Sequence, residues 1–184
     1  MAKIAGNFKD SIVVIYDNNN NYVAQTIITE HDKREMLIEI PDSLDNIKSG
    51  TRLNVLIIHT GGVSEFGGVL RRTSRGACEI SLFGERQREG RSATRHILNV
   101  PGQINNLIIN NKPETLQSPL NVIVENLSST GVLINSRDVR LETGFILQIE
   151  LNIHGKEAII FGNVVRERRN ADETFSYGCH LIFL

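Results

Sequence analysis

The two halves of this chain meet at Gly84-Glu-Arg-Gln-Arg-Glu-Gly-Arg-Ser-Ala-Thr-Arg-His96. This stretch holds four arginines but only two acidic residues, and it has the apolar periodicity of neither a strand nor a helix. Such a composition favours contact with solvent over burial in a core. We therefore predict that residues 85–96 form a basic linker between two folded domains.

Short runs of apolar and β-branched residues recur on both sides of this linker. Turn-forming residues separate them, as in a series of strands. Six runs precede the linker, at residues 11–16, 22–29, 35–40, 52–59, 63–70 and 77–82. Six follow it, at residues 104–109, 120–125, 131–136, 145–153, 158–166 and 175–183. The four prolines fall in the gaps between these runs, at Pro41, Pro101, Pro113 and Pro119.

Helical patterns are missing from the sequence. No capped segment of ten or more residues carries apolar positions at helical spacing, and residues 43–48 support at most one helical turn. We therefore predict an all-β chain with two small antiparallel β-barrel domains, at residues 1–84 and 97–184, joined by the Arg-rich linker.

Composition and charge narrow the possible partners. Twenty Lys and Arg against 21 Asp and Glu give a formal net charge of −1, which argues against binding to long duplex nucleic acid. Three Tyr, seven Phe and no Trp provide few stacking platforms for single strands. An anionic ligand would therefore need a local cluster of cations. Fourteen of the 20 cations are Arg, which suits planar contacts with phosphates and guanine edges.

The sequence favours a cytoplasmic protein. Its start lacks the apolar core of a signal peptide, and no apolar run approaches the roughly 18–20 residues that cross a bilayer, so we expect no membrane span. Cys78 and Cys179 lie in apolar stretches about a hundred residues apart, and we expect buried free thiols.

Two short motifs carry the chemistry of the second half. Arg91-Ser-Ala-Thr-Arg95 places two arginines four residues apart, and Asn126-Leu-Ser-Ser-Thr-Gly131 is a polar turn between two predicted strands. Alone, the first is typical of a solvated charged segment and the second of an ordinary turn. In this order, about thirty residues apart and at the start of a domain of strands, they resemble the PilZ family of cyclic di-GMP receptors.

The resemblance covers residues 85–184. Ile160-Phe-Gly-Asn-Val-Val-Arg166 and Tyr177-Gly-Cys-His-Leu-Ile-Phe183 look like the last two strands of the six-stranded PilZ barrel. Residues 1–84 look like the N-terminal β domain of flagellar-brake-type proteins. The pieces that carry this second similarity are Ile38-Glu-Ile-Pro41, Lys48-Ser-Gly50 and Glu65-Phe-Gly-Gly-Val69.

The family resemblance implies a cyclic di-GMP site at Arg91, Arg95, Asn126, Ser128 and Gly131. Arginine forks match phosphates and the O6 and N7 acceptors of guanine, and Asn126 would accept from the guanine N–H edge. The Ser128 hydroxyl either bonds the ligand or clamps the turn. Gly131 either supplies a positive φ or leaves room for the ligand.

Further cations are weaker candidates for the same site. Arg86, Arg88 and His96 would enlarge the positive field or contact a second ligand molecule, although solvated linker positions are the favoured interpretation. Arg166 would contact a phosphate, although an exposed strand position is favoured there. Gly90 stands where many relatives carry another Arg, which leaves the number of bound ligand molecules open.

Nothing in the sequence indicates an enzyme. The five histidines show no metal-ligand spacing with cysteines or acids, and no nucleophile, His and acid stand in a recognisable context, so we expect no metal and no cofactor. The resemblance implies a non-catalytic cyclic di-GMP receptor whose two domains rearrange on binding and control motility, polysaccharide production or a related output. Its protein target would be, for example, the flagellar motor or the polysaccharide synthesis machinery. The alternative is a PilZ-like adaptor that binds a protein without nucleotide.

Overall fold

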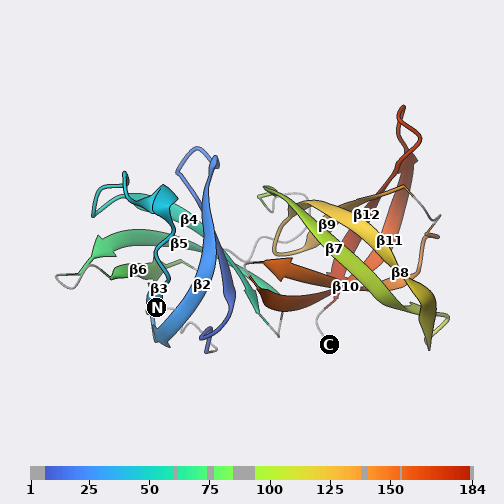
Figure 1. The fold of residues 1–184 in the computed structure, drawn as a ribbon, viewed down its shortest axis with the longest axis horizontal. Coiled ribbons are helices and arrows are strands. Elements are labelled where there is room, and N and C mark those ends of the chain that lie inside the picture. Colours follow the sequence, from blue (N-terminus) through green and yellow to red (C-terminus); the bar gives the residue numbers. More distant parts are fainter. Residues whose placement is uncertain are drawn as a thin grey trace. The chain divides into compact units, whose positions relative to one another are not determined.

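A computed structural model describes residues 7–59, 62–73, 77–84, 94–137, 141–153 and 155–182. The chain forms two compact units, one from Met1–His59 with Val63–Gln87 and the other mainly from Arg88–Leu184. In each unit six antiparallel strands close into a barrel (Figure 1). The prediction of an all-β chain with two β-barrels is confirmed. The described residues contain one short 3₁₀ helix, Asp42–Leu44, where the sequence allows a single turn.

The first barrel has the strand order β1-β2-β3-β6-β5-β4, and β4 pairs back with β1. Its interior is apolar, and alternate strand residues such as Val13, Ile15, Val55 and Ile57 point into it beside Phe66. The strands are β1 (Ile12–Tyr16), β2 (Tyr22–Asp32), β3 (Glu35–Ile38), β4 (Arg52–His59), β5 (Gly62–Arg72) and β6 (Cys78–Phe83).

The asparagine run between β1 and β2 forms the predicted turn. The Asp17 carboxylate accepts the backbone N–H groups of Asn19 and Asn21, both at 2.8 Å. Asn20 has a φ of 66°, a conformation that Asn tolerates better than most residues. The turn therefore satisfies its own backbone groups through side chains.

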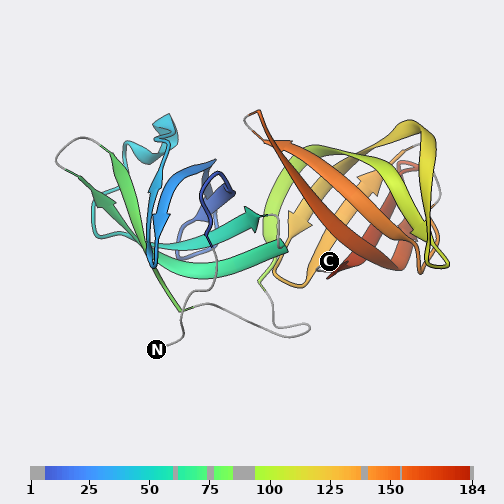
Figure 2. The same cartoon turned by 90° about the horizontal axis from the view of Figure 1, so that it is seen from below.

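The second barrel has the strand order β10-β11-β12-β9-β8-β7, and β7 pairs back with β10. Figure 2 shows its strands wrapping around a common axis. Along β7 the side chains alternate between buried and exposed, as in a strand with one face on a core. The strands are β7 (His96–Ile109), β8 (Lys112–Leu127), β9 (Gly131–Ser136), β10 (Ile146–Ile153), β11 (Lys156–Arg169) and β12 (Phe175–Ile182).

Strands β7 and β8 are longer than the sequence predicts, and they contain three prolines that were expected in gaps. Pro101 lies one residue outside the β7–β10 ladder, which begins at Gly102. Pro113 and Pro119 precede Ile123, where the pairing of β8 with β9 begins. A proline lacks the N–H that a ladder needs, so it fits a strand where one edge has no neighbour. The prediction that Pro101, Pro113 and Pro119 lie between strands is therefore wrong, because each lies at a strand position that needs no N–H on its unpaired side.

The core of the second barrel can be tested on β10. Ile149 is 0% exposed and should contribute to the core, so Ile149→Ala should lower the free energy of unfolding by about 2–5 kcal/mol through the cavity that it leaves. Ile159 on the neighbouring β11 is 45% exposed. Ile159→Ala is the matched control, with an expected loss of about 0.5 kcal/mol. Urea denaturation measures both, and equal losses would contradict the inward and outward alternation.

The part of the chain that the structure describes contains no helix long and apolar enough to span a bilayer.

Candidate functional site

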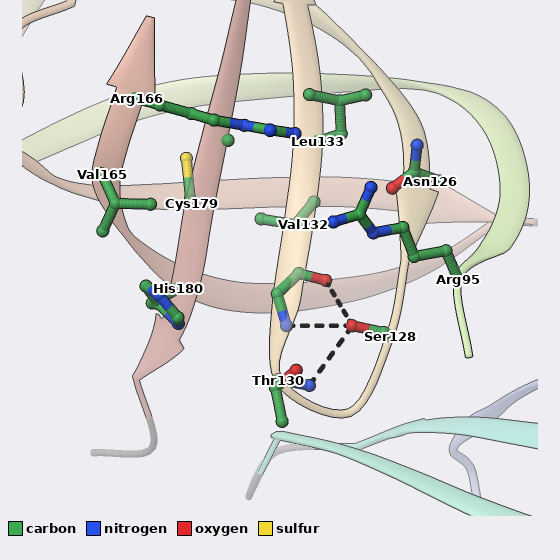
Figure 3. A pocket seen from close by; sticks show the side chains of 12 residues that line it. Arg95, Asn126, Ser128, Thr130, Val132, Leu133, Val165, Arg166, Cys179 and His180 are labelled. Carbon is green, nitrogen blue, oxygen red and sulfur yellow. Dashed lines mark hydrogen bonds between the residues drawn. The ribbon is translucent and has the colours of Figure 1, made fainter. Parts of the chain in front are cut away.

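A pocket of about 260 Å³ lies on the second barrel, next to the turn that joins β8 to β9 (Figure 3). Side chains from the residue before β7, from β8 and β9, and from the neighbouring strands β11 and β12 form its wall. The lining residues are Arg95, Asn126, Ser128, Thr130, Gly131, Val132, Leu133, Val165, Arg166, Gly178, Cys179 and His180.

Asn126 reaches this wall because a β-bulge interrupts β8. Val124 pairs with Ile134 on β9, but Asn126 already pairs with Leu133, so Glu125 is an extra residue in β8. A bulge breaks the two-residue alternation and redirects side chains. Glu125 and Asn126 are both half-buried between the buried Val124 and Leu127, so two successive polar side chains lie on the outer face.

Ser128 holds the turn between β8 and β9. Its Oγ accepts the backbone N–H of Gly131 at 3.1 Å and that of Thr130 at 3.4 Å, and the hydroxyl donates to the Gly131 carbonyl at 3.2 Å. The dashed lines in Figure 3 show this arrangement. The sequence leaves two roles open for Ser128, bonding the ligand or clamping the turn. These hydrogen bonds correspond to the second role.

Of the two roles predicted for Gly131 from the sequence, the positive φ is wrong, whereas room for a ligand stays a prediction at this residue of the pocket wall. It is absent from the glycines with positive φ, so its freedom of φ is not used. A Cβ at this position would instead lie 3.0 Å from the carbonyl oxygen of Cys179 on β12. The missing side chain therefore allows β9 and β12 to approach closely at the edge of the pocket.

A second bulge places Arg166 at the pocket. Val164 pairs with Cys179 and Arg166 pairs with Gly178, so Val165 is an extra residue in β11. Arg166 lies flat across Gly178, where a Cβ would come within 2.8 Å of the Arg166 Cγ. Within the described residues the Arg166 guanidinium makes no hydrogen bond or ion pair, so its charge is available to an anion.

Arg95 brings a second cation to the same wall. It is exposed and stands directly before β7, and Figure 3 shows its side chain on the side of the pocket where Asn126 lies. Among the described residues no carboxylate lines the pocket, so the two guanidinium groups face no acidic side chain from that part of the chain within it. Val132, Leu133 and Val165 add an apolar surface. The arrangement suits a flat, anionic ligand with hydrogen-bonding edges.

The structure brings together five residues that the sequence analysis names: Arg95, Asn126, Ser128, Gly131 and Arg166 all line this pocket. His96 does not line it, because it begins β7 with its side chain 0% exposed; the solvated linker position expected for it is wrong. The remaining candidates, Arg91, Arg86 and Arg88, lie outside the described residues.

Seven lining residues were missed by the sequence analysis. Sequence alone does not show which positions of β9, β11 and β12 come together, because that depends on strand order and on the two bulges. Gly178 was the residue that sequence reasoning could most easily have found, since a glycine inside an apolar strand marks a place where another group approaches the backbone closely. The missed residues are Thr130, Val132, Leu133, Val165, Gly178, Cys179 and His180.

The two cysteines are buried and free, as predicted. Burial raises the pKa of the Cys179 thiol to about 12 and also raises the pKa of Cys78. The described residues hold no group of three or more His, Cys, Asp or Glu side chains placed to bind a metal ion. Cys179 is therefore a neutral part of the pocket wall rather than a nucleophile.

The raised pKa predicts slow alkylation of Cys179. At pH 8 a thiol with this pKa is only about one part in ten thousand thiolate, the reactive form. We expect iodoacetamide to leave Cys179 unmodified in the native chain and to modify it rapidly in urea, as measured by peptide mass spectrometry. Rapid native modification would show that the thiol is neither buried nor protonated.

The Ser128 clamp can be tested against its neighbour. Ser128→Ala removes the acceptor of two backbone N–H groups and should lower the free energy of unfolding by about 1–2 kcal/mol. Ser129 is the matched control, because its buried Oγ has no hydrogen-bond partner in the described part of the chain. Ser129→Ala should be neutral or slightly stabilising. Chemical denaturation distinguishes the two, and equal effects would contradict a clamp.

Comparisons with known proteins give structural matches only. No protein-family model matches this chain, and no curated protein sequence matches it significantly. The Bacillus subtilis inhibitor of motility (MotI/DgrA) is 12% identical, with a TM-score of 0.39, over 96% of this chain and 88% of that chain.

Two further solved structures contain c-di-GMP. The K. pneumonia MrkH–c-di-GMP complex is 18% identical, with a TM-score of 0.38, over 95% of this chain and 80% of that chain. Escherichia coli YcgR in complex with c-di-GMP is 12% identical, with a TM-score of 0.38, over 94% of this chain and 76% of that chain.

Proposed function

We propose that this chain is a non-catalytic receptor for cyclic di-GMP and that the pocket beside the β8–β9 turn is its binding site. The observation that carries this proposal is one wall on which two arginines and an asparagine meet, with no carboxylate from the described part of the chain beside them. A cyclic dinucleotide offers the complementary groups, namely two phosphates and two guanines.

Each side chain has a separate task in the proposed complex. Arg95 and Arg166 hold phosphate oxygens or the O6 and N7 edge of guanine through charge-assisted bonds. The Asn126 amide oxygen accepts from the guanine N–H edge. Leu133 and Val165 pack against the face of the base. Ser128 acts through the turn that it clamps, so it positions the site rather than binding the ligand.

We also propose that Arg91, four residues before Arg95, supplies a further guanidinium. Ligand binding would then restrict the segment that precedes β7 and so change the arrangement of the two domains. Such a shift is limited by the difference in ligand affinity between the two arrangements. The output would be motility, polysaccharide production or a related process, through a protein target.

The test of the proposed function is the loss of one arginine. Arg95→Ala should weaken cyclic di-GMP binding by about 30–150-fold, because a charge-assisted bidentate contact contributes on the order of 2–3 kcal/mol. Arg169→Ala is the matched control, since Arg169 is an exposed arginine outside the pocket, 3.7 Å from Glu173. Isothermal titration calorimetry of the full chain measures both affinities and the stoichiometry.

Two outcomes would contradict the proposal. One is normal affinity in Arg95→Ala, which would move the site elsewhere. The other is an unchanged melting temperature of the wild-type chain in excess cyclic di-GMP, since a ligand at a hundred times its dissociation constant stabilises by about 2.7 kcal/mol. The latter result would favour the protein-binding adaptor.

A further inference from the structure

A second pocket, of about 630 Å³, adjoins the first on the same barrel. The two pockets share Leu133 and Arg166. In the strand register Gly178 lies between these two residues, opposite Leu133 on β9 and opposite Arg166 on β11. The two pockets are therefore lobes of one groove across the outer face of β9, β12 and β11. The other residues of the second lobe are Glu125, Arg168, Asn170, Ala171, Asp172 and Ser176.

The first lobe is too small to hold a whole cyclic dinucleotide, so we expect such a ligand to occupy both lobes. Pockets for organic ligands of drug size measure about 300–1,000 Å³. The first lobe, at about 260 Å³, falls below this range, whereas the second, at about 630 Å³, lies within it. A ligand with two bases that enters the first lobe must therefore extend past Arg166 into the second.

We propose that the second lobe binds the second guanine of cyclic di-GMP and that Glu125 reads the Watson–Crick edge of that base. This inference rests on the proposed function. The bulge in β8 carries the argument, because it directs two successive residues to different lobes: Asn126 lines the first and Glu125 lines the second.

One oxygen of the Glu125 carboxylate is held by a hydrogen bond, and the other can accept one from a ligand. Its Oε1 accepts a hydrogen bond from the Asn135 side-chain amide at 3.1 Å, which fixes the carboxylate, while its Oε2 accepts none within the described residues. Guanine presents an N1–H and an N2 amino group along its Watson–Crick edge, and a carboxylate accepts from both. Adenine has an acceptor at N1, which a carboxylate repels. Glu125 would therefore favour guanine.

The remaining charged groups of the second lobe fit the same base. Arg168 is exposed and makes no hydrogen bond or ion pair within the described residues, so it can donate to O6 and N7. The other acid, Asp172, uses its Oδ1 to accept the Thr174 hydroxyl at 2.7 Å and the Thr174 N–H at 3.3 Å. Those hydrogen bonds lower the Asp172 pKa and tie it to its own turn. Asp172 is also exposed, whereas Glu125 is half-buried in the wall of the lobe, so we assign the contact with the base to Glu125.

The experiment compares two cyclic dinucleotides on two variants. The full chain, Glu125→Gln and Glu150→Gln are titrated by calorimetry with cyclic di-GMP and with 3′,3′-cyclic GMP–AMP. Glu150 is the matched control, because it is a half-buried glutamate outside both lobes that also accepts from side-chain amides, at 2.7 and 2.9 Å. Melting temperatures without ligand confirm that each variant is folded.

We expect Glu125→Gln to weaken cyclic di-GMP binding by about 10–100-fold, the effect of one bidentate base contact. Affinity for cyclic GMP–AMP should stay the same or rise, because its guanine occupies the first lobe and glutamine can pair with adenine in the second. Glu150→Gln should bind both nucleotides as the wild-type chain does.

The outcomes separate this inference from the proposed function. If Glu125→Gln binds cyclic di-GMP as tightly as the wild-type chain, or loses both nucleotides equally, the second lobe does not read guanine, and only this inference fails. If the wild-type chain binds neither nucleotide, the proposed function fails and this inference fails with it. If Glu125→Gln does not fold, Arg168→Ala is tested in its place and should also weaken cyclic di-GMP binding. Normal affinity in Arg168→Ala would overturn the inference.

Discussion

Because the barrel of the second unit is closed and filled, any ligand-binding residues have to lie on its outer face or in its turns. Six strands enclose an interior that aliphatic side chains fill, so a ligand has to bind to the outer face or to the turns. A regular strand offers only every second residue to that face. Two bulges remove this limit, one at Glu125 on β8 and one at Val165 on β11. Each places two successive side chains on the outer face, and the groove is built from them.

Charge is divided unequally along this groove. Of the residues that the structure describes, the first lobe holds two arginines and no acid, whereas the second holds Glu125 and Asp172 beside Arg166 and Arg168. Arg166 belongs to both lobes, and Gly178 leaves the space in which its side chain lies. The position of this one cation therefore links the two lobes, and it depends on strand register rather than on either motif that stands out in the sequence.

Much of the fold could be predicted from patterns of two-residue alternation and turn chemistry. The observed bounds of β9 equal the predicted ones, and those of β4 do as well. Residues 96–103 were missed because Pro101 and Asn99 look like breaks, although the structure accommodates them at an unpaired edge and in a bulge. Asn126 and Ser128 could be named because their spacing forms a motif. Val165 could not, because a bulge is a relation between two strands.

The Ser128 clamp has a consequence for how any ligand would be captured. The β8–β9 turn satisfies its own backbone groups, so that side of the groove is shaped during folding and loses little entropy when it is occupied. Arg95, in contrast, lies on the exposed segment directly before β7, outside this clamped turn. One side of the groove is therefore built by a hydrogen-bonded turn, and the other by a single arginine side chain that precedes the barrel. Substitutions before β7 can alter the second side while the barrel keeps its core.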